Sequence, residues 1–203
     1  MTVGTESIPK VDKLFGPGNQ YVTAAKEYAG SLGVAMDMPA GPSEVLVLAD
    51  DSANPSFVAA DLLSQAEHGP DSQVVLVTTS RRVQNEVKNE LKRQIRQLER
   101  SEIASTALRS SLSVFFGDIE AAIEFANFYA PEHWIIQTEQ ADVWASRVLS
   151  AGSVFVGAYS PESAGDYASG TNHTLPTAGW AKTYSGVSVE KKKKTVSFQS
   201  ITP

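Results

Sequence analysis

The sequence contains three histidines, and each lies close to a carboxylate in a polar segment. His68 follows a glutamate in "SQAEHG", and His133 follows Glu132 in "YAPEHWI". His173 ends the segment "SAGDYASGTNH", a few positions after Asp166. Imidazole and carboxylate groups commonly move protons or bind metals at neutral pH, so these three segments are the candidates for chemistry.

Gln65 and His68 are three positions apart on a predicted helix, so their side chains share one helix face. An amide oxygen and an imidazole on one face can bind a single metal ion, whereas Glu67 would point elsewhere. The alternative is an ordinary helix C-terminus, with His68 near the last carbonyl groups and Gly69 as the residue that ends the helix. Because glutamine is an uncommon zinc ligand, this stretch alone favours the alternative.

The tripeptide "PEH" at 131–133 precedes a predicted strand. In an extended chain the side chains of Glu132 and His133 diverge, so both face one cleft only at a bend, which Pro131 favours. A functional interpretation assigns proton transfer to both residues, because histidine and a glutamate of raised pKa are the usual acid/base groups. A strand-entry loop with a buried, hydrogen-bonded histidine explains the segment equally well.

Residues 160–173 form a polar segment after a predicted core strand. Long polar loops at the carboxyl ends of parallel strands are where α/β folds place ligands. Asp166 and His173 offer an oxygen and a nitrogen donor there. A functional loop is therefore favoured over a disordered surface loop.

Two further loops are weak candidates when each is taken alone. In "FGPGNQYV", Gly16, Gly18 and Asn19 open a predicted helix in the manner of a phosphate-binding turn. In "MPAGPSE", Ser43 supplies a free hydroxyl just before a predicted strand.

Composition limits the class of protein. The chain has 203 residues, ordinary hydrophobic and charged fractions, and a net charge of −6, which argues against nucleic-acid binding. It has no cysteine, so any metal must be held by His, Asp, Glu or Gln, which suits zinc or manganese. No apolar run approaches the roughly 20 residues that cross a bilayer, and the N-terminus has no signal-like apolar segment. We therefore expect a cytoplasmic or organelle-matrix protein without membrane partners.

Short apolar runs alternate with amphipathic ones from residue 44 onward, which predicts a mainly parallel, Rossmann-like α/β sheet with helices on both faces. We expect residues 45–185 to form this main domain, residues 1–44 to be the end of a second α/β domain, and residues 186–203 to begin a tail. The strands are predicted at 45–49, 73–79, 112–116, 133–137 and 152–157. The helices are predicted at 20–32, 55–67, 80–98, 118–129 and 140–149.

Five segments, in their order along the chain, resemble histidinol dehydrogenase, and the fungal form most of all. They are "VDKLFGPGNQYV", "DMPAGPSEVLV", "DLLSQAEHGPDSQV", "YAPEHWIIQ" and "AGSVFVGAYSPESAGDYASGTNHTLPT". The resemblance runs from about Ile8 to Tyr184. It implies an oxidoreductase of histidine biosynthesis that oxidises L-histidinol to L-histidine in two steps through an aldehyde, with two NAD and one zinc.

The resemblance also implies roles for particular residues. Glu132 and His133 match the family's acid/base pair, and Asn19 matches a cofactor-contacting position. Three residues match zinc ligands: Gln65, His68 and Asp166. The substrate-contacting positions are Ser43, Gln65, His68, His133, Asp166 and His173.

Parts of the family pattern have no counterpart in this sequence. The family's fourth zinc ligand, a histidine, and a substrate-contacting glutamate belong to a C-terminal tail, and the family's N-terminal half holds much of the NAD site. In the family this tail reaches the active site of the partner in a homodimer. We therefore expect a central fragment that binds zinc weakly and turns over substrate poorly.

Two other classes of function are compatible with the same residues. A zinc-dependent hydrolase would use Gln65, His68 and Asp166 with Glu132 as the base, and would need neither NAD nor histidinol. A non-catalytic module would only bind metal or dimerise.

Overall fold

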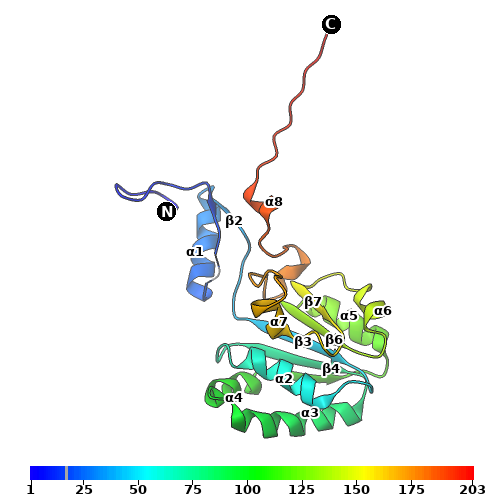
Figure 1. The fold of residues 1–203 in the computed structure, drawn as a ribbon. Helices are drawn as coiled ribbons and strands as arrows, with labels where there is room; N and C mark the ends of the chain where they lie inside the picture. The colour runs from blue at the N-terminus through cyan, green and yellow to red at the C-terminus, as the bar shows by residue number, and fades with distance from the viewer. Residues whose placement is uncertain (17) are drawn as a thin grey trace.

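The computed structural model describes residues 1–16 and 18–203, and its centre is a five-stranded sheet (Figure 1). The strands lie in the order β5-β4-β3-β6-β7, and every neighbouring pair is parallel. The predicted parallel α/β sheet is thereby confirmed. The strands are β3 (Glu44–Ala49), β4 (Gln73–Thr78), β5 (Leu112–Phe115), β6 (His133–Gln137) and β7 (Ser153–Val156).

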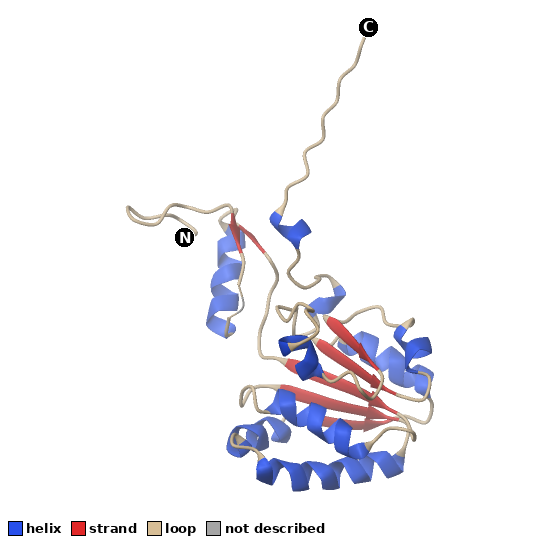
Figure 2. Cartoon of the chain, viewed as in Figure 1, coloured by secondary structure: helices blue, strands red, loops and turns tan. Residues whose placement is uncertain are grey.

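Helices cover both faces of the sheet, so the core has two halves (Figure 2). Val45 and Val47 of β3 belong to one half, whereas Leu46 and Leu48 belong to the other, because alternate residues of a strand point to opposite faces. Every residue of β3 is buried, as expected for a central parallel strand. One layer contains α2 (Pro55–Ala66), α3 (Arg81–Gln94) and α4 (Ser101–Arg109), and the other contains α5 (Ile119–Tyr129) and α6 (Ala141–Ala145).

Two features of the first layer differ from the prediction. The helix predicted over 80–98 is α-helical only to Gln94, and a 3-10 turn, η1 (Ile95–Gln97), follows it. Helix α4 was not predicted. Its buried residues are Ala104 and Ala107, whose small side chains give a weak periodic signal.

Two features near the C-terminal half of the sheet also differ. The helix predicted over 140–149 is shorter and ends at Ala145. The segment 160–173, predicted as a loop, contains the helix α7 (Glu162–Tyr167), which contacts α2. Its buried residues are Glu162 and Gly165, so it has no apolar periodicity to reveal it.

A small β-α-β unit precedes the sheet and stands apart from it in Figure 1. It consists of β1 (Lys13–Leu14), α1 (Gln20–Ser31) and β2 (Ala35–Met36), and its two strands are parallel. After β7 and α7 come η2 (Trp180–Lys182) and α8 (Val189–Lys192), and residues 193–203 form neither helix nor strand. Within the described ranges, no helix is both long enough and apolar enough to cross a membrane.

Candidate active site

All but one of the predicted site residues converge on one cavity of about 230 Å³. They come from the loop before β3, the end of α2, the start of β6, α7 and the loop after it. Those that line the cavity are Ser43, Gln65, His68, Glu132, His133, Asp166 and His173.

Asn19 is the one predicted site residue that is not among the described residues lining the cavity, although its neighbour Gly18 is. It is the N-cap of α1, and its side-chain oxygen accepts hydrogen bonds from the N–H groups of Tyr21 and Val22 at 3.1 and 3.2 Å. The structure therefore gives Asn19 a capping role.

The cavity lies at the amino ends of the strands. Ser43 immediately precedes β3, and His133 is the first residue of β6. The prediction of a ligand loop at the carboxyl end of a strand was wrong for Asp166. Although the segment starts at the carboxyl end of β7, α7 carries the chain back, and Asp166 Oδ2 lies 4.0 Å from His68 Nε2.

His68 is oriented by the last turn of its own helix. Its Nδ1 lies 2.7 Å from the carbonyl oxygen of Ser64. Because a carbonyl oxygen only accepts, Nδ1 carries a ring hydrogen, which leaves Nε2, 4.0 Å from Asp166 Oδ2, as the ring nitrogen on the side of the possible metal donors. The helix-capping bond and a metal-donor role are thus compatible, since such a bond fixes the tautomer of metal-binding histidines.

Gln65 is fully buried, and neither its amide oxygen nor its amide nitrogen has a hydrogen-bond partner among the described residues. An unsatisfied buried amide is destabilising and is rare in folded proteins. A metal ion bound at the amide oxygen would satisfy one of these groups. The imidazole, amide and carboxylate donors that surround this position suit zinc.

The charges of the cavity also favour a cation. Glu162 and Asp166 line it, and the described lining residues include no lysine or arginine. A potential donor atom of His68, one of Glu162 and one of Asp166 all lie within 4.8 Å of one another. Buried carboxylates need a positive partner, and a metal ion is the partner that this geometry accepts.

Glu162 is a residue that the sequence analysis missed. It is 1% exposed, and within the part of the chain that the structure describes one of its carboxylate oxygens has no hydrogen-bond partner. Its spacing of four positions from Asp166 places both side chains on one face of α7. That spacing was a usable signal, but it has meaning only on a helix, and the segment was predicted to be a loop.

Glu132 and His133 are both buried and both line the cavity, which confirms that the chain bends there. The bend begins at Ala130, whose φ of 55° is left-handed, just before Pro131. His133 Nδ1 lies 3.3 Å from the carbonyl oxygen of Glu44, so Nδ1 carries the hydrogen and Nε2 is a free base.

Burial shifts the pKa values of Glu132 and His133 in opposite directions. It raises the pKa of Glu132 to about 8, and the negative charge of Glu44 adds to the effect, although a hydrogen bond from the Glu44 N–H at 3.0 Å opposes it. Burial lowers the pKa of His133 to about 4. At pH 7 the glutamate therefore holds a proton that it can exchange near pH 8, and the histidine is neutral.

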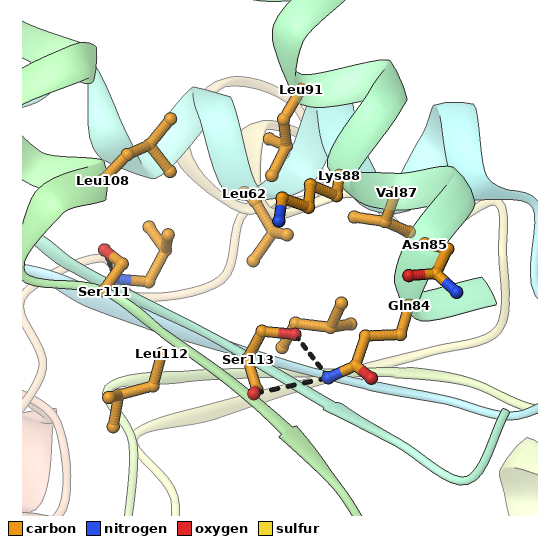
Figure 3. Close-up of a pocket in the computed structure, with 12 residues that line it drawn as sticks. Leu62, Gln84, Asn85, Val87, Lys88, Leu91, Leu108, Ser111, Leu112 and Ser113 are labelled. Atoms are coloured by element: carbon orange, nitrogen blue, oxygen red, sulfur yellow. Dashed lines mark hydrogen bonds between the residues drawn. The ribbon is translucent and has the colours of Figure 1, made fainter. Parts of the chain in front are cut away.

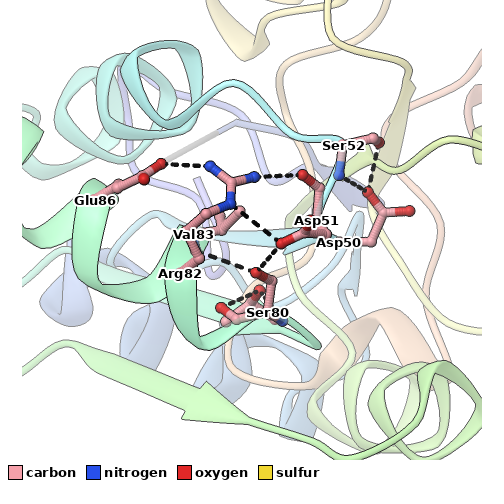
Figure 4. A network of polar contacts seen from close by, with 8 residues as sticks. Asp50, Asp51, Ser52, Ser80, Arg82, Val83 and Glu86 are labelled. Atoms are coloured by element: carbon pink, nitrogen blue, oxygen red, sulfur yellow. Dashed lines mark hydrogen bonds and ion pairs between the residues drawn. The ribbon is translucent and has the colours of Figure 1, made fainter.

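The opposite edge of the sheet carries a structural network (Figure 4). Ser80 Oγ donates to the carboxylate of Asp51 and also caps α3. Arg82 Nη2 donates to the carbonyl oxygen of Asp51 at 2.6 Å, and its Nη1 donates to Glu86 at 2.6 Å. These contacts link the loop after β3 to the start of α3.

A second cavity at that edge, of about 470 Å³, has Asp50, Asp118 and Glu139 in its lining. Asp118 already caps α5 by accepting a hydrogen bond from the N–H of Ala121. The carboxyl ends of parallel strands usually bind phosphate-containing ligands, but three carboxylates would repel a phosphate.

Figure 3 shows a third cavity, of about 390 Å³, between α3, α4 and the β5 edge. Leucines 62, 91 and 108 line much of it, and Lys88 is the one charged group among its described lining residues. Its described lining offers no acid/base pair and no set of metal donors, so it is a weaker candidate site than the cavity at the amino ends of the strands.

A parallel sheet that brings a buried Glu–His pair beside a set of potential metal donors is compatible with a metal-assisted α/β enzyme. The family model "Histidinol dehydrogenase" matches residues 1–203. The chain is 62% identical over its full length to the histidinol dehydrogenase of Bacteroides fragilis and 56% identical to the chloroplastic one of Arabidopsis thaliana, and covers 47% and 44% of them. The chain belongs to the histidinol dehydrogenase family.

A solved structure agrees with these matches. The histidinol dehydrogenase of Elizabethkingia anophelis superposes with a TM-score of 0.89 at 60% identity, over 94% of this chain and 44% of that one. This chain thus spans about half the length of the relatives it matches. These relatives are bacterial and plant proteins, and they do not test the expected likeness to the fungal form.

Proposed function

We propose that this chain carries the zinc- and substrate-binding part of a histidinol dehydrogenase, which oxidises L-histidinol to L-histidine through an aldehyde and reduces two NAD. Family membership supports the reaction. The observation that supports the site is the fully buried Gln65, whose amide has no hydrogen-bond partner among the described residues and which lines the same cavity as His68 and Asp166. These three residues would hold the zinc ion.

Zinc, when bound, supplies a positive charge that fixes the imidazole and amine of the substrate. His133 would accept the alcohol proton at Nε2 when the alcohol carbon gives up its first hydride, for which NAD would be the acceptor. Glu132 then takes a proton from the water that adds to the aldehyde, and the resulting hydrate gives up the second hydride. Ser43 and His173 contact the substrate from the loops that frame the cavity.

The proposal extends to the rest of the chain. Residues 45–185 form the main domain, residues 186–203 begin the tail, and residues 1–44 belong to a domain on the NAD side, with Asn19 near the cofactor. The acidic lining of the carboxyl-edge cavity supports placing NAD elsewhere. The whole protein acts as a homodimer in the cytoplasm.

Calorimetric titration of L-histidinol into the chain, with and without zinc, tests the proposal. We expect zinc-dependent binding that weakens at least about tenfold in Asp166→Ala. Asp142→Ala, an exposed aspartate on α6, is the matched control and should bind like the unaltered chain. An affinity for L-histidinol that changes neither with zinc nor in Asp166→Ala would contradict the proposal. Zinc- and Glu132-dependent ester hydrolysis without histidinol binding would identify the hydrolase instead.

A further inference from the structure

We propose that Glu44, the first residue of β3, is a positioning residue for the acid/base pair Glu132 and His133. The inference rests on the proposed function, because that function gives the pair its role in proton transfer. Glu44 itself is not among the described residues that line the cavity. Its effect on the reaction therefore passes through the two residues that it holds.

The main chain of Glu44 contacts both members of the pair. Its N–H donates to Oε2 of Glu132 at 3.0 Å, and its carbonyl oxygen lies 3.3 Å from Nδ1 of His133. The register pairs Val45 with His133, so Glu44 is the residue just before the first pair of β3 and β6. One residue at this end of the sheet therefore orients both side chains.

The side chain of Glu44 is buried and is held from two directions. Oε1 accepts a hydrogen bond from the N–H of Ala178 at 2.7 Å, directly after the cavity-lining Thr177. Oε2 accepts one from the hydroxyl of Tyr129, the last residue of α5, at 2.8 Å. The carboxylate thus ties the start of β3 to α5 and to the loop that follows His173.

Both partners of this carboxylate are themselves constrained. The hydroxyl oxygen of Tyr129 also lies 2.7 Å from Oε1 of Gln73, and Gln73 Nε2 donates to the carbonyl oxygen of Ser110 at 3.1 Å. Ala178 has a left-handed φ of 53°, which a non-glycine residue keeps only where the surrounding contacts fix it. The network therefore sets the position of the start of β3 relative to α5, β4 and this loop.

Nitrogen NMR of the zinc-free chain with labelled histidines tests the proposal at pH 7. In the unaltered chain the His133 ring should keep its hydrogen on Nδ1, so its two nitrogen signals, identified by their loss in His133→Asn, should be well separated. Glu44→Ala removes both side-chain bonds, and we expect the two signals to shift toward each other as the ring exchanges between tautomers. Glu44→Gln keeps an oxygen that can accept from Ala178 and a polar group beside Tyr129, so it should restore the separated signals.

A second variant keeps the test decisive if Glu44→Ala does not fold. Tyr129→Phe deletes one hydroxyl and leaves the bond from Ala178 intact, so it should shift the two His133 signals in the same direction by a smaller amount. Tyr28→Phe on α1 and Glu124→Ala on α5 change exposed residues and should leave the signals in place.

Urea unfolding of the same variants separates positioning from stability. A lower urea midpoint with unchanged His133 signals in the folded chain would overturn the proposal, because Glu44 would then only stabilise the fold. Signals in Glu44→Gln that match those of Glu44→Ala would overturn the role of the two side-chain bonds.

Substrate binding distinguishes this inference from the proposed function. In the zinc-loaded chain Glu44→Ala should weaken L-histidinol binding about threefold or more, because a misplaced His133 loses its contact with the substrate. If the unaltered chain binds no L-histidinol, the proposed function is wrong, whereas the ring signals of His133 still decide the role of Glu44.

Discussion

Two histidines of the cavity are oriented in the same way. His68 Nδ1 bonds the carbonyl oxygen of Ser64 in its own helix, and His133 Nδ1 bonds that of Glu44 on the neighbouring strand. In both rings Nδ1 is therefore the hydrogen-bonded nitrogen, and both residues line the cavity. The sequence allowed both residues to be chosen as candidates, because imidazole beside carboxylate is a chemical pattern. Their tautomers depend on carbonyl partners, one of them 89 positions away, and could not be predicted.

The perturbed carboxyl group of Glu132 gives a pH-dependent prediction. Because its folded-state pKa is raised to about 8, Glu132 holds its proton at pH 7 and loses it as the pH rises through 8. Carbon NMR of the chain with labelled glutamate carboxyl groups should show a signal with a midpoint near pH 8. The deprotonated fraction of Glu132, which the proposed water addition needs, therefore increases with pH.

Two variants assign that signal. Glu132→Gln should remove it, whereas Glu120→Gln, a change at an exposed residue of α5, should leave it in place. If the signal that Glu132→Gln removes has its midpoint near pH 4, the burial of Glu132 does not control its titration.

At the scale of elements, the cavity depends on how closely β7 approaches the start of β6. Gly152 donates its N–H to the carbonyl oxygen of Pro131 at 3.0 Å, and Ser153 donates to that of Glu132 at 2.8 Å. A Cβ atom on Gly152 would lie 2.6 Å from the Glu132 carbonyl oxygen, a backbone atom that cannot rotate away. A glycine is therefore required at position 152, because the backbone of Glu132 lies too close to admit a Cβ atom.

Gly152→Ala should consequently destabilise the chain by about 1–3 kcal/mol, because the two strands must separate to admit the methyl group. Urea unfolding measures the change. Gly117→Ala is the matched control, since a Cβ there meets nothing within 4 Å and its φ is not left-handed. Equal stability changes in the two variants would mean that the close contact with Glu132 does not matter.

The elements that could be predicted are those with a strong apolar signal. All five strands of the main sheet were found, because each is a compact apolar run between polar turns. Helix α7 was not predicted, because its buried residues are a glutamate and a glycine, which give no apolar periodicity. Missing it also hid Glu162 and left Asp166 at the wrong end of the sheet, so one unseen helix accounts for both errors.

At the scale of the whole molecule, the order of the strands in the sheet could not be predicted from the sequence. The chain builds β3, β4 and β5 outward in one direction and then returns to place β6 and β7 on the other side of β3. This reversal creates the crevice at the carboxyl ends where α/β proteins usually bind ligands. Here that crevice is acidic, and the predicted site residues, distant in sequence, meet at the opposite edge.

A buried ion pair fixes the N-terminal β-α-β unit. Lys26 contacts Asp37, with side chains 8% and 0% exposed. Lys26 Nζ donates to the carbonyl oxygens of Gly16 and Met38 at 2.9 and 3.0 Å, and the Asp37 carboxylate accepts from the N–H groups of the same two residues. Burial acts to raise the pKa of Asp37, but the hydrogen bonds outweigh it and hold the pKa below its ordinary value.

Lys26→Met should loosen this unit without unfolding the sheet. Removing one partner leaves the Asp37 charge buried and unpaired, which costs about 3–5 kcal/mol. Hydrogen exchange should therefore accelerate in α1 while strands β3 to β7 keep their protection. Adding Asp37→Asn should restore part of the lost protection, because no unpaired charge then remains. Lys88→Met, at an exposed site on α3, is the control, and acceleration spread evenly over the sheet would show that the pair supports the whole fold instead.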